Sequence, residues 1–147
     1  MIDSNLQNDV EGSEGCKLAA YQDPLGFWTI GWGHLIPPNV EPEGLVWTQQ
    51  QADDQLVKDL ESAAVYTAAT PEWTALDTPC RQNAVIELCF NMRSKWLLFV
   101  KCRAAIRAKS WQDAHDALLN SLWATQVHAV RAERLADYLL TGEYPSA

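Results

Sequence analysis

Apolar residues recur every three or four positions along most of the chain, and this spacing predicts a largely helical protein. The first such stretch is short. Leu6 and Val10 lie four residues apart, which places them on one face of a helix over residues 3–14. Glu14 follows one turn later along the same stripe. The pattern therefore predicts a carboxylate at the end of a half-buried helix.

A long helix is predicted to begin at Thr48, because Thr48 and Gln51 have the spacing of a capping box ahead of an apolar face. The chain beyond it keeps the helical periodicity. A capping Thr or Ser predicts further helix starts at Thr70-Pro71, Thr78-Pro79 and Ser110-Trp111. The last helix is predicted to end at Thr141-Gly142, since glycine favours the left-handed conformation that follows a helix.

Residues 18–34 have a different pattern, which predicts a β-hairpin. Asp23-Pro24-Leu25-Gly26 is typical of a β-turn, and Phe27 to Gly33 is rich in aromatic and β-branched residues. Alternation along this returning strand places Thr29 on the opposite face from Trp28 and Trp32. Residues 35–46 contain three prolines and a glycine, which indicates a loop or a poor edge strand.

These elements predict an α+β protein: a small N-terminal lobe with a β-hairpin, joined by a long helix to a larger all-α lobe. The expected boundaries are residues 1–47 for the small lobe, 48–69 for the connecting helix and 70–147 for the helical lobe. The C-terminal helix region is expected to lie against the small lobe. All 147 residues are expected to form a single domain, with the functional cleft between its lobes.

The composition is that of an ordinary globular protein. Hydrophobic residues make up 48% of the chain and charged residues 20%, which argues against a disordered chain. No apolar run is long enough to span a membrane, and the N-terminus lacks the basic and apolar regions of a signal peptide. The four cysteines, Cys16, Cys80, Cys89 and Cys102, are therefore expected to be reduced. Two disulfides are the alternative.

The formal net charge of −8 is unevenly distributed. Residues 1–63 carry 11 acids and 2 bases, a net charge of −9, whereas residues 64–147 carry 8 acids and 9 bases, a net charge of +1. One stretch without acids contains six bases: Arg93, Lys95, Lys101, Arg103, Arg107 and Lys109. These bases are available to an anionic partner, and an ordinary solvated helix face is the alternative interpretation.

The residue types at Glu14, Asp23 and Thr29 fit the hydrolysis of a glycosidic bond. That reaction generally uses two carboxyl groups, of which one protonates the leaving oxygen and the other activates water or acts as a nucleophile. Glu14 at a helix end and Asp23 in a turn have different environments, as such a pair requires. The Thr29 hydroxyl, on the returning strand, is placed to hold a water near Asp23. The spacing alone is also compatible with ordinary surface acids.

The residues around this trio resemble the signature of the phage-type lysozymes and endolysins, glycoside hydrolase family twenty-four. Glu14 is followed after eight residues by Asp23 and after five more by Thr29, and Ile30-Gly31-Trp32-Gly33-His34 completes the signature. The resemblance implies that Glu14 is the general acid, that Asp23 serves the opposite face of the sugar and that Thr29 positions the nucleophilic water. It implies hydrolysis of the β-1,4 bond between N-acetylmuramic acid and N-acetylglucosamine, with no cofactor and no metal.

The resemblance extends more loosely over the rest of the chain. It implies a structural pair between His34 and Asp59 of the connecting helix, and an approach of Arg131 to Glu14. It also implies substrate contacts at Gly33, Leu35 and Phe90.

The family also suggests partners and a location. The expected partner is the glycan strand of peptidoglycan, together with the anionic envelope through the six bases, and we expect a monomer that binds no nucleic acid. The expected location is the host cytoplasm until a holin-like pore releases the protein to the periplasm. Two alternatives stay open. One is a lytic transglycosylase, which leaves an anhydro-sugar end, and the other is a tail-associated virion protein that binds or degrades peptidoglycan.

Overall fold

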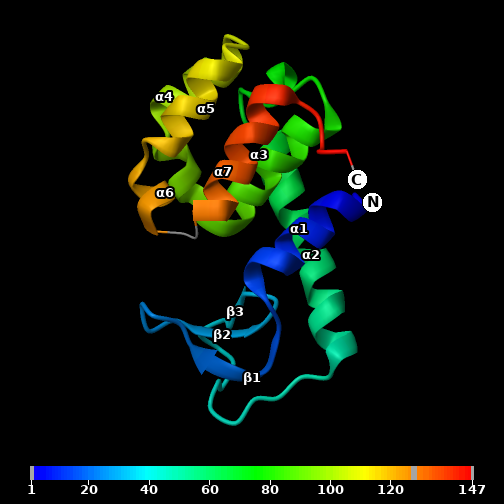
Figure 1. The fold of residues 1–147 in the computed structure, drawn as a ribbon. Helices are drawn as coiled ribbons and strands as arrows, with labels where there is room; N and C mark the ends of the chain where they lie inside the picture. Colours follow the sequence, from blue (N-terminus) through cyan, green and yellow to red (C-terminus); the bar gives the residue numbers. More distant parts are fainter. Residues whose placement is uncertain (1, 127–128, 147) are drawn as a thin grey trace. The chain divides into compact units, whose positions relative to one another are not determined.

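The computed structural model describes residues 2–126 and 129–146. It divides into two compact units, Met1–Ser62 and Ala63–Ala147. Figure 1 draws the first unit in blue to teal and the second in green to red. The helix α2 (Gln49–Ala68) runs through the boundary between them. The predicted α+β class is confirmed, because a helix and a small antiparallel sheet precede a long helix and a mostly helical C-terminal part.

The first unit begins with α1 (Ser4–Glu14), which agrees with the predicted helix over residues 3–14. The Asp3 side chain caps it by accepting a hydrogen bond of 2.8 Å from the backbone N–H of Asn5. Leu6 and Val10 are both buried, as their spacing predicts. Gly15 ends the helix with a φ of 66°, so Glu14 is its last residue.

Three antiparallel strands follow, in the order β1 (Lys17–Gln22), β2 (Trp28–Gly31) and β3 (His34–Leu35). The predicted turn joins the first two, because the N–H of Gly26 donates to the carbonyl of Asp23 at 2.8 Å. The returning strand is shorter than predicted. It stops at Gly31, since Gly31 and Gly33 have φ values of 67° and 79° that turn the chain back into β3. Trp32 therefore lies in a turn rather than on a strand face.

The start of α2 follows the predicted capping box. The N–H of Gln51 donates to Thr48 Oγ1 at 3.1 Å, and Gln51 Oε1 accepts from the N–H of Thr48 at 2.8 Å. Ala52, Leu56 and Leu60 form the buried face of the helix. The connecting helix is thus a correct prediction from local sequence.

The second unit is helical throughout its described part. Its elements are η1 (Trp73–Ala75), α3 (Pro79–Met92), η2 (Arg93–Leu98), α4 (Val100–Arg107), α5 (Trp111–Leu119), α6 (Leu122–Gln126) and α7 (Ala129–Thr141). In Figure 1, α5 lies beside α4 and α7, and contacts also join α3 to η2 and α7. Leu88, Leu118, Leu135 and Leu139 are fully buried among them. Gly142 has a φ of 72° and ends α7 where the sequence predicts it.

One predicted helix start is wrong. Thr70-Pro71 leads only into the single 3-10 turn of η1, because the Thr70 hydroxyl donates back to the carbonyl of Thr67 at 2.6 Å and does not cap a following turn. Thr78 does cap α3, since its Oγ1 accepts from the N–H of Arg81 at 3.2 Å. Ser110 precedes α5 as predicted but makes no capping hydrogen bond through its side chain.

All four cysteines are thiols rather than members of a disulfide, in agreement with the expected reduced state. Cys80, Cys89 and Cys102 are buried, and Cys16 is partly exposed. Burial raises the pKa of the Cys89 thiol to about 11 and that of Cys102 to about 12. These two side chains are therefore neutral packing residues at physiological pH.

A buried carboxylate organises one side of the second unit. Glu72 is fully buried, and its carboxylate accepts from Arg103 Nε at 2.8 and 3.1 Å and from the Trp96 indole at 3.3 Å. Burial raises the pKa of Glu72, but hydrogen bonds from Arg103, its own backbone and Trp96, together with the Arg103 charge, bring it below the ordinary 4.5. Arg103 is consequently not one of the surface bases that the sequence predicts.

We predict that Arg103→Met destabilises the fold by about 3–5 kcal/mol at neutral pH, because it leaves the buried Glu72 carboxylate without its cation. Chemical denaturation measures this, with Lys101→Met as the exposed control. The native pKa of Glu72 is lowered, so the pair contributes fully above the ordinary pKa and its contribution is lost as the pH falls through the native pKa. The difference between the wild type and the variant should therefore shrink in acid. Equal stability at neutral pH would contradict the account.

Candidate active site

The carboxylate of Glu14 lies directly on the backbone of the turn between β2 and β3. Gly33, in that turn, has a φ of 79°, and a Cβ atom built on it would be only 2.6 Å from Glu14 Oε2. Only glycine leaves room for the carboxylate at this position. The end of α1 and the second hairpin turn of the sheet therefore meet at one point, and Glu14 is half-buried there.

The Asp23 carboxylate is fixed by the turn that it begins. Its Oδ1 accepts hydrogen bonds of 2.9 Å from the N–H groups of Leu25 and Phe27, an arrangement typical of aspartate in turns. Pro24 contributes no N–H and has a restricted φ. Oδ1 is thus the oxygen through which the turn holds the side chain. The sequence predicts the turn but not that a single oxygen of Asp23 accepts both hydrogen bonds.

Thr29 lies in the middle of the sheet and is 4% exposed. It pairs with Tyr21 of β1 on one side and with Leu35 of β3 on the other. Cross-strand partners point to the same face, so these three side chains share one face of the sheet. The Thr29 hydroxyl donates to the carbonyl of Phe27 at 3.1 Å. Its lone pairs are therefore what it can offer to a water molecule.

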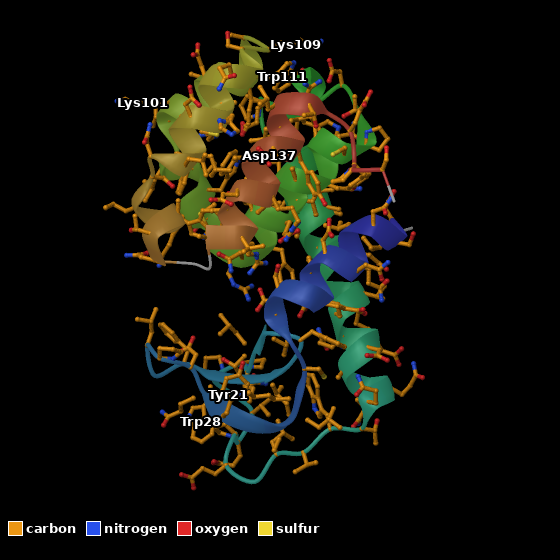
Figure 2. All side chains as sticks on the ribbon, viewed as in Figure 1. Tyr21, Trp28, Lys101, Lys109, Trp111 and Asp137 are labelled. Atoms are coloured by element: carbon orange, nitrogen blue, oxygen red, sulfur yellow. The ribbon has the colours of Figure 1, made fainter. Side chains whose placement is uncertain are left out.

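Tyr21 is a site residue that the sequence reasoning missed. Burial raises its pKa, and the negative charges of Glu14 and then Asp23 raise it further. The phenol therefore lies within electrostatic range of both carboxylates. The Lys17 ammonium lies 4.3 Å from the centre of the Tyr21 ring. Figure 2 labels Tyr21 on the sheet of the first unit. Counting residues back from the hairpin turn places Tyr21 opposite Thr29, so strand register in the sequence could have identified Tyr21.

The residues on either side of Gly33 fasten the turn to α2. The hydrogen bond expected between His34 and Asp59 is present, with 2.8 Å between Nδ1 and Oδ2. Trp32 makes a second bond, from its indole N–H to Asp53 Oδ1 at 2.8 Å. The His34–Asp59 bond is thus the structural pair that the resemblance implies. Asp53 was not predicted, because nothing local in the sequence couples it to Trp32.

The predicted site residues of the second unit have contacts of their own. Arg131 Nε donates to Glu87 Oε2 at 2.9 Å, and Arg134 binds the same carboxylate. Phe90 is half-buried in α3. The approach of Arg131 to Glu14 and the substrate contact of Phe90 remain predictions, as does the substrate contact of Leu35 in the first unit.

Residues 2–126 and 129–146 contain no group of three His, Cys, Asp or Glu side chains arranged to hold a metal ion. None of the helices in this part of the chain is both long and apolar enough to cross a membrane.

Comparison with known proteins assigns the chain to a family. The family model described as phage lysozyme matches residues 11–136, which is most of the chain. The chain belongs to the phage lysozyme family.

Relatives of this phage lysozyme family member come from different settings. It is 26% identical to probable T4-type lysozyme 1 of Dictyostelium discoideum over 95% of both chains. It is 28% identical to the endolysin of Salmonella phage P22 over 83% of this chain and 82% of that one. It is also 26% identical to pre-baseplate central spike protein Gp5 of Enterobacteria phage T4, over 90% of this chain but 27% of that protein.

Membership of the family gives the chemistry and the substrate class. The protein is a glycoside hydrolase, a lysozyme with muramidase activity on peptidoglycan. Its relatives are named as a probable T4-type lysozyme, an endolysin and a pre-baseplate central spike protein. Relatives of this chain therefore have more than one biological setting.

We predict that Gly33→Ala lowers lysozyme activity about 100-fold, because the new methyl group displaces the Glu14 carboxylate. Gly44→Ala is the matched control: Gly44 has a φ of 77°, but a Cβ there meets nothing within 4 Å. Both variants should lose a similar stability of about 1–2 kcal/mol from backbone strain. Turbidity assays and thermal unfolding measure the two effects. Equal activity of the two variants would show that the contact with Glu14 is unimportant.

Proposed function

We propose that this chain is an endolysin that hydrolyses the β-1,4 bond between N-acetylmuramic acid and N-acetylglucosamine and thereby lyses a bacterial host. In this proposal Glu14 is the general acid, and Asp23 and Thr29 hold the attacking water. The observation that carries the assignment is that one small sheet positions all three groups. Glu14 lies on the Gly33 turn, Asp23 is held in the turn between β1 and β2, and Thr29 lies in the central strand, opposite Tyr21.

The roles follow from what each group can do where it lies. Glu14 is half-buried against the Gly33 backbone, which fixes its carboxyl group at the edge of the sheet, where it can donate a proton to the leaving oxygen. Asp23 is oriented by two backbone N–H donors, so its carboxylate can accept a proton from a water without first reorganising. The Thr29 hydroxyl uses its proton on Phe27 and so accepts from the same water. A water attacking directly in this way inverts the anomeric carbon.

The biological setting is part of the proposal. The protein would accumulate in the host cytoplasm and reach the periplasm through a holin-like pore, and it would act as a monomer on glycan strands. The exposed bases Arg93, Lys95, Lys101 and Arg107 support approach to an anionic envelope. Arg103 and Lys109 are not among them, because Arg103 is paired with buried Glu72 and Lys109 lies 3.8 Å from the Asp77 carboxylate.

We predict that Glu14→Gln and Asp23→Asn each lower kcat/KM on purified peptidoglycan about 10²–10⁴-fold while remaining folded. Both substitutions keep the size of the side chain and remove only its acid–base chemistry. Soluble muropeptide release measures the activity, and circular dichroism checks the fold. Glu11→Gln, one turn earlier on α1, is the control for loss of a charge and should keep near wild-type activity. An active Glu14→Gln enzyme would refute the proposed general acid.

We predict that cytoplasmic expression leaves bacteria intact until a pore or a solvent permeabilises the inner membrane. Lysis should then follow, and it should require Glu14. The loss of culture turbidity before and after permeabilisation measures this. Lysis without permeabilisation would contradict the holin-dependent setting. Finding the protein in purified phage particles would favour the alternative of a tail-associated virion protein, and one relative is named a pre-baseplate central spike protein.

A further inference from the structure

Three apolar side chains of the second unit are exposed within four consecutive positions. Leu97 at the end of η2 is 44% exposed, Leu98 is 76% exposed, and Val100 at the start of α4 is 65% exposed. Single exposed apolar residues are common on protein surfaces. Three of them within four positions are less common, and apolar patches on the surface mark sites of interaction.

The two aromatic residues within this run hold it in place. Trp96 is fully buried, donates its indole N–H to Glu72 and stacks on Phe99 with ring centres 5.6 Å apart. Trp96 and Phe99 thus occupy the inward positions, and the residues between and beyond them face outward. Burying Leu98 would require the segment to rotate and lose the Trp96–Glu72 bond. The exposure is therefore built into the fold by the same carboxylate that binds Arg103.

Basic residues flank the apolar residues in the sequence. Arg93, Lys95 and Lys101 are exposed in the same segment, and the chain has no acid between Glu87 and Asp113. Figure 2 shows Lys101 on the outside of α4. We call the exposed set Arg93, Lys95, Leu97, Leu98, Val100 and Lys101 the 93–101 surface. It combines three cations with three apolar side chains on a fixed backbone.

We propose that the 93–101 surface binds an anionic phospholipid bilayer, with Leu98 and Val100 entering the interface and the cations resting on the headgroups. Charge complementarity selects a negative partner, and the apolar run selects one with an accessible hydrocarbon layer. A hydrated polyanion such as an envelope glycan would meet the cations but leave the leucines in water. The overall charge of −8 does not prevent this contact, since at physiological salt charges beyond about 8 Å are largely screened.

This inference goes beyond the proposed function and rests only on the second unit. It adds a membrane-surface contact to an enzyme whose substrate is a glycan. Bilayer binding and peptidoglycan hydrolysis can be measured separately, so that failure of one leaves the other standing.

The test is co-flotation of the full chain with vesicles of phosphatidylcholine, alone or mixed with phosphatidylglycerol. We expect binding only to the mixed vesicles, weakened by added salt. Leu98→Glu should lower the partition coefficient at least about tenfold, because a carboxylate replaces an inserted leucine. Leu122→Glu is the matched control: Leu122 is 80% exposed in α6, with no base among its sequence neighbours, and its variant should bind within about twofold of wild type.

A second pair of variants tests the charge. Lys101→Gln should weaken binding to the mixed vesicles severalfold, whereas Lys58→Gln, which removes one exposed lysine from α2, should not. All four variants should keep wild-type hydrolysis of soluble peptidoglycan fragments.

Three outcomes would overturn the proposal. The first is no binding to anionic vesicles, and the second is equal loss of binding in Leu98→Glu and Leu122→Glu. The third is a Leu98→Glu variant that still floats with vesicles but no longer sediments with purified peptidoglycan, which would make the 93–101 surface part of the substrate site.

Discussion

The close approach of the Glu14 carboxylate to the Gly33 backbone is the constraint on which the first unit depends. A side chain at position 33 would overlap the carboxylate, so α1 must end at Glu14 and the sheet must turn at Gly33 for the two to meet. The positive φ values of Gly15, Gly31 and Gly33 allow both events. The three glycines thus bring a helix end and a hairpin together at the proposed general acid.

The surrounding contacts maintain that meeting point. Trp32 and His34, on either side of Gly33, are hydrogen-bonded to Asp53 and Asp59 of α2, so the turn is held from both flanks by one helix. The Asp23 carboxylate is held independently by its own turn. Separate anchoring allows the two carboxylates to be positioned without depending on each other. A site with preorganised groups stabilises charge that develops during the reaction at little reorganisation cost.

In the second unit, a buried carboxylate likewise fixes the segment around it. Glu72 is buried with Arg103 and Trp96, and this cluster sets which side chains of η2 and the start of α4 point inward. Breaking such a pair is costly because it leaves a buried charge unpaired. The arrangement therefore maintains the outward direction of Leu98 and its basic neighbours.

Local patterns predicted much of this fold, and contacts distant in sequence account for most of what they missed. The α1 stripe, the Asp23–Gly26 turn, the Thr48 capping box and the end of α7 depend on neighbouring residues, and all are found as predicted. The helix start predicted at Thr70-Pro71 is wrong because the Thr70 hydroxyl donates to the carbonyl of Thr67 instead of capping a following turn. The surface position predicted for Arg103 is wrong because its partner, Glu72, lies 31 residues away in the sequence. The trio of Glu14, Asp23 and Thr29 is proposed from a motif, whereas the place of Tyr21 beside it becomes visible only through strand register.

The central claim is that a water held at Asp23 and Thr29 attacks the sugar while Glu14 protonates the leaving oxygen. Digestion of purified peptidoglycan in water enriched in heavy oxygen, followed by mass spectrometry of the released muropeptides, tests it most directly. The account predicts one heavy oxygen at each new reducing N-acetylmuramic acid end. Unlabelled anhydro ends would contradict it and would identify the enzyme as a lytic transglycosylase.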